Sequence, residues 1–363
     1  MDIKTLDLSD HPDFDDHEHI VECRDPASGL HAMIAVHNTN QGPALGGCRM
    51  WPYANREEAL SDVLRLSKGM TYKSALANLP LGGGKAVIIG NPRQDKSREL
   101  LLAMGQFIDL LEGQYITAED SGTSVSDMHV MGERTPHASG VSAASEHGGD
   151  PSPTTAYGAY IGLKTAVQFH LDRDHLHGLK VAVQGVGNVG FHLAKHLVEC
   201  GADVYVSDIH HEHTHRAVEQ LGAVAVPADR IHAHKVDVFS PCAMGGAIND
   251  QTLTELSASV IAGAANNQLA SPAHGVELHN KGVLYVPDYA INAGGIIDIC
   301  YQHYGSDYSD MREHVESTAD TLREIFERSR RENRATSEVA NELAEERCLK
   351  MGSTRPPAES VMG

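Results

Sequence analysis

Short apolar runs alternate with longer amphipathic segments along most of the chain. The short runs predict strands at residues 31–39, 85–89, 114–118, 179–184, 202–207, 236–239, 260–262 and 283–286. The longer segments, with apolar residues about every three or four positions, predict helices at residues 55–77, 97–111, 154–171, 191–200 and 310–349. Strands that alternate with helices pair in parallel, so the second half of the chain predicts an α/β fold with a doubly wound sheet.

The length of 363 residues and one break in the pattern predict two domains. The break is a stretch of glycines and prolines at residues 148–153, which is typical of a hinge. We therefore expect a first domain over residues 1–150 and a second over residues 151–305, followed by charged amphipathic helices at residues 306–350. Residues 351–363 include two adjacent prolines and are expected to be disordered.

A glycine-rich turn connects the strand predicted at residues 179–184 to the next helix. It consists of Gly185, Val186, Gly187, Asn188, Val189 and Gly190. Gly185 permits a tight turn, Gly187 lets a pyrophosphate approach the backbone, and Gly190 lets the helix pack closely on the strand. The N-terminus of the helix adds free N–H groups and a positive dipole end. The order strand, turn, helix, strand therefore predicts a dinucleotide site rather than a glycine turn without a ligand.

An acidic residue, Asp208, ends the next predicted strand. A carboxylate in this place accepts hydrogen bonds from the ribose hydroxyls of NAD and repels the 2′-phosphate of NADP. No arginine follows until Arg216, so the sequence favours NAD as the cofactor. An aspartate that only caps a turn is the alternative.

The charge and hydropathy of the chain exclude several classes of partner. The formal net charge is −20, whereas nucleic acids and anionic membranes require clustered lysine and arginine. No apolar run approaches the ~20 residues of a membrane-spanning helix. The N-terminus shows no basic-then-apolar targeting pattern. We therefore expect a soluble protein that binds neither nucleic acid nor membrane.

The cysteines and histidines predict no metal site. The six cysteines form no Cys-X-X-Cys pair and no metal-ligand spacing, which predicts reduced thiols in a cytoplasmic protein. Of the 23 histidines, the densest run lies at residues 210–215, just after a predicted strand. Structural zinc sites usually include cysteine, so this run and the one at residues 15–19 are interpreted as polar loops. A metal site at these runs is the alternative.

Three glycines precede Lys85 at residues 82–84. They do not form a phosphate-binding loop, because Leu79 stands where the first glycine is required and Ala86 replaces the serine or threonine. A nucleotide-phosphate hydrolase is therefore excluded. Glycines that open an apolar strand suggest instead that a ligand approaches the backbone there.

Three lysines and one aspartate are candidates for proton chemistry. Lys68 and Lys73 lie near the end of a predicted helix, and Lys85 begins the next predicted strand. Two ammonium groups that share a cleft repel each other, so one loses its proton more easily and can act as a general base, while the other holds a carboxylate. Asp120 follows the strand predicted at residues 114–118 and could move a proton or hold an ammonium group. Surface lysines and a turn-capping aspartate are the alternatives.

These candidates lie in segments that resemble the amino-acid dehydrogenase family of glutamate, leucine, phenylalanine and valine dehydrogenases, with most likeness to the leucine and phenylalanine branch. The resemblance covers about residues 22–349. Its segments are GPALGGCRM at 42–50, KGMTYK at 68–73, LGGGK at 81–85, TAED at 117–120, PSPTTAYG at 151–158, PCA at 241–243, ANNQL at 265–269 and PDYAINAGG at 287–295. It implies an N-terminal α/β substrate domain, a Rossmann NAD-binding domain, and C-terminal helices that pack back onto the first domain. It also implies a homo-oligomer, either a dimer or an octamer.

The resemblance further implies roles for single residues. Lys73 resembles the lysine that binds the substrate carboxylate, helped by backbone at Gly46 and Gly47. Lys85 resembles the catalytic lysine that acts through water, and Asp120 the aspartate beside the amino group. The positions that resemble cofactor-binding residues, in addition to the glycine-rich turn and Asp208, are Thr155, Cys242, Ala243, Asn266 and Asn292.

By the same resemblance, five apolar residues meet the side chain of the substrate. They are Leu45, Met70, Ala118, Ile296 and Ile299. None of them can pair with the carboxylate of a glutamate side chain. The two branched isoleucines suggest a pocket for leucine, valine or isoleucine, although apolar pockets separate substrates by only about 1–3 kcal/mol per methylene. Phenylalanine or tryptophan as the substrate, and an ordinary core role for some of these residues, are the alternatives.

The expected function is the reversible, NAD-dependent oxidative deamination of an apolar L-amino acid to its 2-oxo acid and ammonia. A catalytically silent NAD-binding regulator is the alternative from another class. The intact set of Lys73, Lys85 and Asp120 argues against it, because a silent protein has no physical need for all three.

Overall fold

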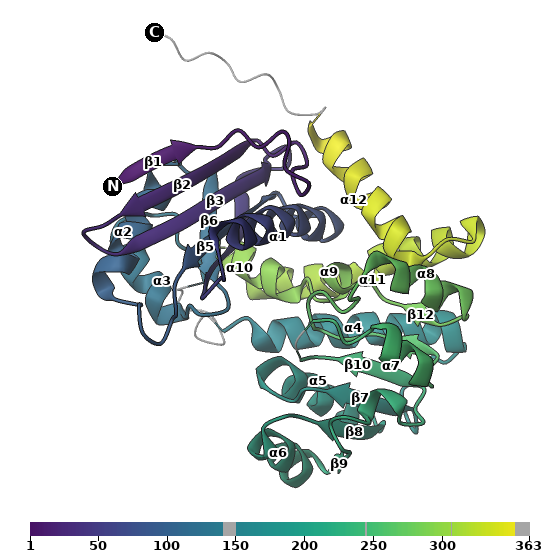
Figure 1. Ribbon diagram of the computed structural model, residues 1–363. Helices are drawn as coiled ribbons and strands as arrows, with labels where there is room; N and C mark the ends of the chain where they lie inside the picture. Colours follow the sequence, from purple (N-terminus) through teal and green to yellow (C-terminus); the bar gives the residue numbers. More distant parts are fainter. Residues whose placement is uncertain (141–149, 244, 306, 353–363) are drawn as a thin grey trace. The chain divides into compact units, whose positions relative to one another are not determined.

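The computed structural model describes residues 1–140, 150–243, 245–305 and 307–352 (Figure 1). Its contacts divide the chain into two compact units. Unit 1 comprises Met1–Gly149 and Ala344–Gly363, and unit 2 comprises Asp150–Leu343. The predicted hinge at residues 148–153 and the predicted tail at 351–363 lie partly outside the described residues.

Unit 1 is built on a six-stranded mixed sheet with the order β1-β2-β3-β5-β4-β6. The strands are β1 (Asp2–Thr5), β2 (His19–Asp25), β3 (Leu30–Asn38), β4 (Ala44–Trp51), β5 (Gly82–Ile89) and β6 (Tyr115–Glu119). The helices are α1 (Arg56–Leu76), α2 (Arg98–Asp109) and α3 (Val125–Gly132). Strand β4 lies between β5 and β6 and is parallel to both, whereas β1, β2, β3 and β5 pair in antiparallel fashion. The carboxyl ends of β5, β4 and β6 therefore meet at one edge of the sheet.

Helices cover both faces of this sheet, which explains why its strands are apolar without a strict alternation. Met33 and Ala35 of β3 pack with Leu60 and Leu64 of α1 on one face. Ile34, between them in the chain, packs with the helices of the other face in a cluster that includes Met104, Phe107 and Met131. Successive residues of a strand point to opposite faces, so a sheet that is covered twice needs apolar residues at every position.

The glycine run at residues 82–84 serves packing within the protein. A Cβ atom at Gly83 would lie 2.0 Å from the backbone nitrogen of Thr71 in α1, and one at Gly82 would lie 2.0 Å from the carbonyl oxygen of Asn38 in β3. At Gly84 it would lie 2.8 Å from the Tyr115 ring. The expectation that these glycines admit a ligand to the backbone is therefore wrong, because protein atoms occupy the space that side chains would fill.

Unit 2 contains a six-stranded parallel sheet with the order β12-β11-β10-β7-β8-β9. Its strands are β7 (Lys180–Gln184), β8 (Asp203–Ser207), β9 (Val224–Ala225), β10 (Val238–Pro241), β11 (Val260–Ile261) and β12 (Leu284–Tyr285). Its helices are α4 (Ser152–Leu171), α5 (Asn188–Glu199), α6 (His211–Leu221), α7 (Asp250–Glu255), α8 (Pro272–Asn280), α9 (Asp288–Ile291), α10 (Gly294–Tyr304) and α11 (Tyr308–Glu332), with a 3₁₀ turn at Ile231–Ala233.

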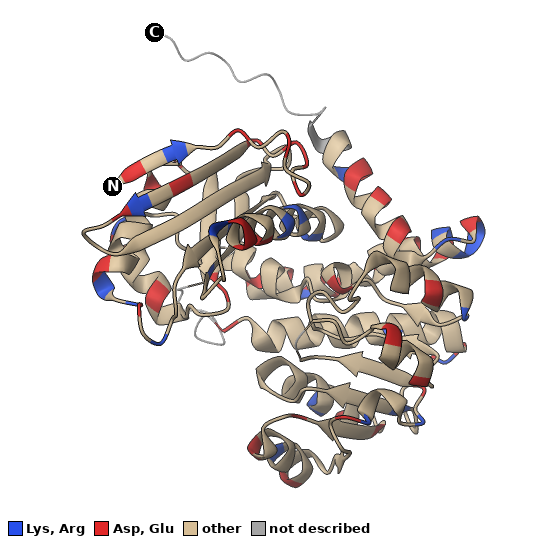
Figure 2. Ribbon diagram, viewed as in Figure 1, with Lys and Arg blue, Asp and Glu red and all other residues tan. Residues whose placement is uncertain are grey.

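The strand order of unit 2 reverses between β7 and β10. From β7 the chain proceeds to β8 and β9 on one side, and then returns to β10, β11 and β12 on the other. Such a reversal leaves a crevice at the carboxyl ends of the two central strands, where doubly wound folds bind nucleotides. Strands β10, β11 and β12 contain no charged residue, and the ribbon of β10 is tan in Figure 2. This composition fits strands that are covered on both faces. The doubly wound fold predicted from the sequence is confirmed.

The C-terminal helices divide between the two units. Helix α11 belongs to unit 2, where Phe326 lies 5.3 Å from Phe169 of α4 between ring centroids, and Val315 and Leu322 lie against glycines of α4. Helix α12 (Thr336–Gly352) groups with unit 1 from Ala344 onward. Within unit 2 the apolar face of α11 is buried on α4, and the packing of residues 306–350 on the first domain stays a prediction.

At its end, α12 is held to α1 by polar contacts within unit 1. The hydroxyl of Tyr72 donates to Glu345 over 2.6 Å. Arg347 donates to the carbonyl oxygen of Leu76 and to the side chain of Asn78, each over 3.1 Å.

Among the helices that the structure describes, none is long and apolar enough to cross a membrane.

We predict that Gly83→Ala lowers the free energy of unfolding by at least about 3 kcal/mol, because the new methyl group would overlap backbone of α1. Gly69→Ala, in helix α1, is the matched control. A Cβ atom there meets nothing within 4 Å, so this change should stabilise the helix by about 0.5–1 kcal/mol. Urea unfolding of both variants measures the difference. Equal stability of the two variants would show that Gly83 is not a packing glycine.

Candidate active site

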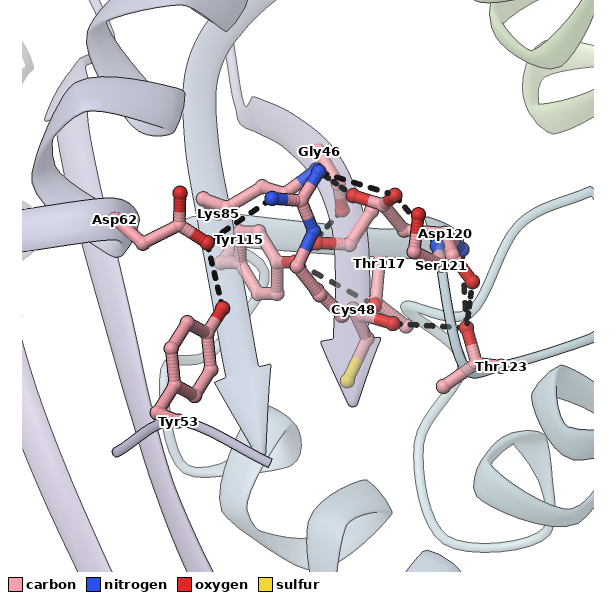
Figure 3. A network of polar contacts seen from close by, with 12 residues as sticks. Gly46, Cys48, Tyr53, Asp62, Lys85, Tyr115, Thr117, Asp120, Ser121 and Thr123 are labelled. Atoms are coloured by element: carbon pink, nitrogen blue, oxygen red, sulfur yellow. Dashed lines mark hydrogen bonds and ion pairs between the residues drawn. The ribbon is translucent and has the colours of Figure 1, made fainter. Parts of the chain in front are cut away.

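The structure brings Lys85 and Asp120 into direct contact. Across strands β5, β4 and β6, Ala86 pairs with Cys48 and Cys48 pairs with Glu119, so Lys85 and Asp120 each lie one residue from this row. The Lys85 Nζ donates a hydrogen bond to Asp120 Oδ2 (Figure 3). Their side chains are only 7% and 17% exposed. Two residues far apart in the sequence thus form a buried ion pair across β4.

The Asp120 carboxylate is held by its surroundings. Its Oδ1 accepts a hydrogen bond of 2.6 Å from the backbone N–H of Ser121. The backbone N–H of Asp120 donates to Thr123 Oγ1 over 3.0 Å, and Thr123 Oγ1 donates to the carbonyl oxygen of Cys48 over 2.8 Å. A Cβ atom at Gly47 would lie 2.7 Å from Asp120 Cβ. Gly47 therefore makes room for the aspartate.

Charge keeps Asp120 ionised. Burial opposes ionisation, but the positive charges of Lys85 and Arg49 outweigh it and hold the pKa of Asp120 well below its usual range. At neutral pH the site therefore contains a buried carboxylate anion beside the Lys85 ammonium group.

Gly46 also has a packing role. A Cβ atom on it would lie 1.8 Å from the carbonyl oxygen of Gly84, so the glycine lets β4 and β5 approach. The buried hydroxyl of Tyr115 donates to the Gly46 carbonyl over 2.6 Å. Burial raises the pKa of Tyr115 well above its usual value, so this hydroxyl remains a donor. The role of Gly46 and Gly47 in binding a substrate carboxylate stays a prediction.

The lysines of α1 are arranged differently from the expectation of paired ammonium groups. Lys68 Nζ lies 2.8 Å from Asp15 Oδ2, and Lys85 contacts Asp120. The charge next to Lys85 in this structure is therefore a carboxylate. Lys73 is half-buried near the end of α1, two residues after Thr71, the residue that packs on Gly83. Its role in carboxylate binding stays a prediction.

The five residues predicted to surround the substrate side chain are distributed over both units. Leu45 and Ala118, in β4 and β6 of unit 1, are 1% and 2% exposed, and Met70 in α1 is half-buried. Ile296 and Ile299 are buried residues of α10 in unit 2. Their contact with a substrate stays a prediction.

The glycine-rich turn of unit 2 has the shape of a pyrophosphate cradle. Gly185 adopts a φ of +88°, and its Cβ atom would lie 2.8 Å from that of Ala243, which follows β10. At Gly190 a Cβ atom would lie 1.9 Å from the carbonyl oxygen of Gly185, whereas at Gly187 it would meet nothing within 4 Å. Helix α5 begins at Asn188 without a side-chain cap. The turn is therefore closed on the protein side and open at Gly187, which fits a phosphate group on the N–H groups of α5.

Asp208 is anchored to this turn. Its Oδ2 accepts a hydrogen bond of 2.9 Å from the backbone N–H of Val186, and its Oδ1 accepts one from His210. Burial opposes ionisation, but these N–H groups lower the pKa of Asp208. The carboxylate thus carries its charge at the end of β8. It also caps the turn, as the alternative proposed, so its bond to a ribose stays a prediction.

A second group of predicted cofactor residues lies at the other side of the crevice. Asn292 Nδ2 donates to Asn266 Oδ1 over 2.7 Å and to the carbonyl oxygen of Ala264 over 3.2 Å. Asn292 Oδ1 is buried and has no hydrogen-bond partner among the described residues. A buried acceptor without a partner fits a ligand that donates there, such as a carboxamide. Cys242 follows β10 and lies against Gly190, and Thr155 donates to the carbonyl oxygen of Pro151.

Two residues near these sites have contacts that the sequence alone did not indicate. Arg216 donates to the carbonyl oxygen of Gly187 over 3.3 Å, and its guanidinium lies 4.0 Å from the centroid of the Phe191 ring. Arg49 lies 3.5 Å from Asp120 Oδ1. Its only sequence signal was its place in the segment at residues 42–50, directly after Gly46, Gly47 and Cys48.

The two histidine runs lie in different surroundings: His17 contacts α1, and His213 lies beside Asp208 of the candidate NAD site. Nε2 of His17 lies 3.1 Å both from the carbonyl oxygen of Leu64 and from Ser67 Oγ. Burial lowers the pKa of His17 to about 4. His213 lies 3.4 Å from Asp208. The described residues contain no group of three or more candidate metal ligands.

The chain is similar to known proteins over nearly its whole length. A family model described as Glu/Leu/Phe/Val dehydrogenase, dimerisation domain, matches residues 17–137, and one described as Glutamate/Leucine/Phenylalanine/Valine dehydrogenase matches residues 150–350. Leucine dehydrogenase of Geobacillus stearothermophilus is 49% identical over 342 residues, which are 94% of this chain and 93% of that protein. Valine dehydrogenase of Streptomyces virginiae is 44% identical, with 93% and 95% covered.

A solved structure is also similar to this chain. The crystal structure of L-tryptophan dehydrogenase from Nostoc punctiforme matches with a TM-score of 0.82 at 41% identity, covering 93% of this chain and 98% of that chain. The chain belongs to the Glu/Leu/Phe/Val dehydrogenase family. The predicted class, an NAD-linked amino-acid dehydrogenase and hence an oxidoreductase, is confirmed.

We predict that Gly187→Ala preserves the unfolding midpoint but weakens NADH binding by about ten-fold or more, because the methyl group enters the space open to the phosphates. Gly190→Ala is the contrast variant, since its methyl group would overlap the Gly185 carbonyl and should lower the unfolding midpoint. Calorimetric titration with NADH and thermal unfolding measure both effects. Unchanged affinity in Gly187→Ala would remove Gly187 from the cofactor site.

Proposed function

We propose that this chain catalyses the reversible oxidative deamination of a branched-chain L-amino acid, with leucine, valine and isoleucine as substrates. The amino acid, NAD⁺ and water give the 2-oxo acid, ammonium, NADH and a proton. The observation that carries the proposal is the buried ion pair of Lys85 and Asp120 in a chain of this family.

In this proposal each charged residue of unit 1 has one task. Lys73 binds the substrate carboxylate through its ammonium group. Lys85 moves protons to and from the water that hydrolyses the imine, and the Asp120 anion holds the amino group that leaves as ammonia. NAD, when bound, supplies the acceptor for the hydride from the α-carbon.

Unit 2 supplies the residues that would hold NAD. The glycine-rich turn and the N-terminus of α5 take the pyrophosphate, Asp208 accepts from the ribose hydroxyls, and Asn292 accepts from the carboxamide. Support comes from the open space at Gly187 and from the buried, unpartnered Oδ1 of Asn292.

The choice of an apolar amino acid as the substrate rests on two observations. The five residues assigned to the pocket carry no charge, so a glutamate side chain finds no partner among them. Leucine and valine dehydrogenases are among the relatives with more than two-fifths identity over nearly the whole chain. The likeness to an L-tryptophan dehydrogenase makes an aromatic substrate the second candidate.

The decisive experiment is NADH formation from NAD⁺ with a panel of L-amino acids at alkaline pH, with NADP⁺ in parallel. We expect turnover with leucine, valine or isoleucine, and kcat/KM at least about ten-fold lower with NADP⁺, because the Asp208 carboxylate repels the 2′-phosphate. Turnover with phenylalanine or tryptophan alone would keep the reaction and overturn the pocket. No turnover despite NAD binding would favour the silent regulator.

Lys85→Ala is the control that links this activity to the ion pair. It should lose at least about a hundred-fold in kcat, because it removes the group that moves the proton. NADH affinity should be unchanged, since the assigned cofactor residues belong to unit 2. Undiminished turnover in this variant would contradict the assigned role of Lys85.

The chain is also proposed to form a homo-oligomer, either a dimer or an octamer. The family model that residues 17–137 match is described as a dimerisation domain. In addition, β1 is an exposed edge strand, and edge strands are templates for pairing. Light scattering should give a mass at least twice the 39.1 kDa of one chain. A monomer that turns over would refute the assembly without affecting the chemistry.

A cytoplasmic location is proposed on the basis of the cysteines. All six are free thiols, and four of them are buried. Thiols that remain reduced are typical of proteins in a reducing compartment.

A further inference from the structure

Arg49 occupies the space between two carboxylates. Its guanidinium lies between Asp62 of α1 and Asp120, which follows β6. The NH1 group donates to Asp62 Oδ2 over 3.0 Å, and NH2 lies 3.5 Å from Asp120 Oδ1. The hydroxyl of Tyr53 donates to the same Asp62 oxygen over 2.6 Å. Helix α1 is thereby connected to the carboxylate that contacts Lys85.

The position of the Arg49 side chain does not satisfy all of its hydrogen-bond donors. Its Nε is buried and has no partner among the described residues. A buried donor without a partner is unfavourable for stability and requires another explanation. The two carboxylates account for the position of the side chain, because each takes one end of the guanidinium fork.

The four charged groups balance only while Lys85 keeps its proton. Lys85 and Arg49 are then positive, and Asp120 and Asp62 are negative. When Lys85 gives its proton to water, the buried Asp120 anion loses its direct counterion. Arg49 cannot lose a proton at these pH values, so it remains as a positive charge beside Asp120.

We propose that Arg49 is a positioning residue for the reaction: it holds Asp120 in place as an anion in both protonation states of Lys85, and Asp62 and Tyr53 hold Arg49. This inference rests on the proposed function, in which Lys85 moves the proton. Without Arg49, Asp120 would retain the Lys85 proton more strongly, and the proton would be harder to give up.

The other titratable groups nearby do not account for such an effect. Burial raises the pKa of Tyr53 and raises that of the Cys48 thiol to about 12, so both stay protonated in the assay. Burial likewise raises the pKa of Tyr115. Lys96 and Asp127, the remaining charges close to Cys48, pair with each other over 2.7 Å.

The test compares Arg49→Gln, Arg49→Lys and the control Arg65→Gln by the pH dependence of kcat/KM for deamination. In Arg49→Gln the rise of kcat/KM with pH should move about one unit to higher pH, and kcat should fall about ten- to a hundred-fold with a smaller change in KM. Arg49→Lys restores the charge, so its pH midpoint should return towards that of the wild type. Arg65→Gln removes the same charge elsewhere, because Arg65 is an exposed residue of α1 that pairs with Asp13. This variant should leave kcat, KM and the pH midpoint unchanged.

A lower kcat in Arg49→Gln with an unmoved pH midpoint would overturn the proposal and leave Arg49 as a structural tie. A midpoint that moves equally in Arg65→Gln would overturn it as well. Thermal unfolding identifies a folding defect, and Arg49→Lys then carries the test, because it keeps the charge between the carboxylates.

A second measurement does not depend on turnover. Trace acetylation of Lys85 against pH, read by peptide mass spectrometry, reports directly how tightly its proton is held. The midpoint should move up by about one pH unit in Arg49→Gln and stay in place in Arg65→Gln. If the wild type shows no amino-acid turnover, the proposed function fails, whereas an acetylation midpoint that does not move refutes the role of Arg49.

Discussion

The chemistry of unit 1 depends on backbone contacts that no side chain could allow. Strands β5, β4 and β6 approach one another only because Gly46, Gly47 and Gly84 lack side chains: a Cβ atom at Gly46 would lie 1.8 Å from the Gly84 carbonyl oxygen. This approach places Lys85 and Asp120 within contact across β4. Glycine is usually explained by its freedom in φ, but at these positions the missing side-chain volume is what matters.

The buried ion pair is energetically unfavourable by itself, and its surroundings compensate for the cost of burying it. Removing two charges from water is costly, and the attraction between them repays this only when further hydrogen bonds satisfy the remaining oxygens. The backbone N–H of Ser121 donates to Asp120 Oδ1, and the guanidinium of Arg49 adds a positive charge 3.5 Å from the same oxygen. Because a buried ion pair contributes little to stability, the proposed proton transfer would give a reason for its presence.

The candidate site of unit 2 depends on strand order, whereas that of unit 1 depends on a buried ion pair. The reversal of strand order between β7 and β10 opens a crevice, and the glycine-rich turn after β7 meets Cys242 and Ala243 after β10 there. Protein atoms occupy the space that a side chain at Gly185 or Gly190 would need. Gly187 is therefore the position in the turn where a phosphate can approach. One short motif and the strand order together define the proposed dinucleotide site.

By itself the sequence determined the local elements and the chemical class. Periodicity predicted β3, α1 and α2, and in unit 2 the helices α4 and α5 and the strands β7, β8, β10, β11 and β12, because a strand or helix buried on a core repeats its apolar residues regularly. The glycine-rich turn, with its neighbours, predicted the dinucleotide site. The family segments predicted the enzyme class that the comparisons confirmed.

Only the tertiary structure decided which distant residues meet. Strand β4 shows no strand pattern in the sequence, because Gly46 and Gly47 have low strand propensity and the strand is stabilised by its two neighbours. The packing of α11 on α4 and the contact of Arg49 with Asp62 and Asp120 likewise left no local signal. Propensity and periodicity describe a segment and its face, whereas a contact depends on the two segments that the fold brings together.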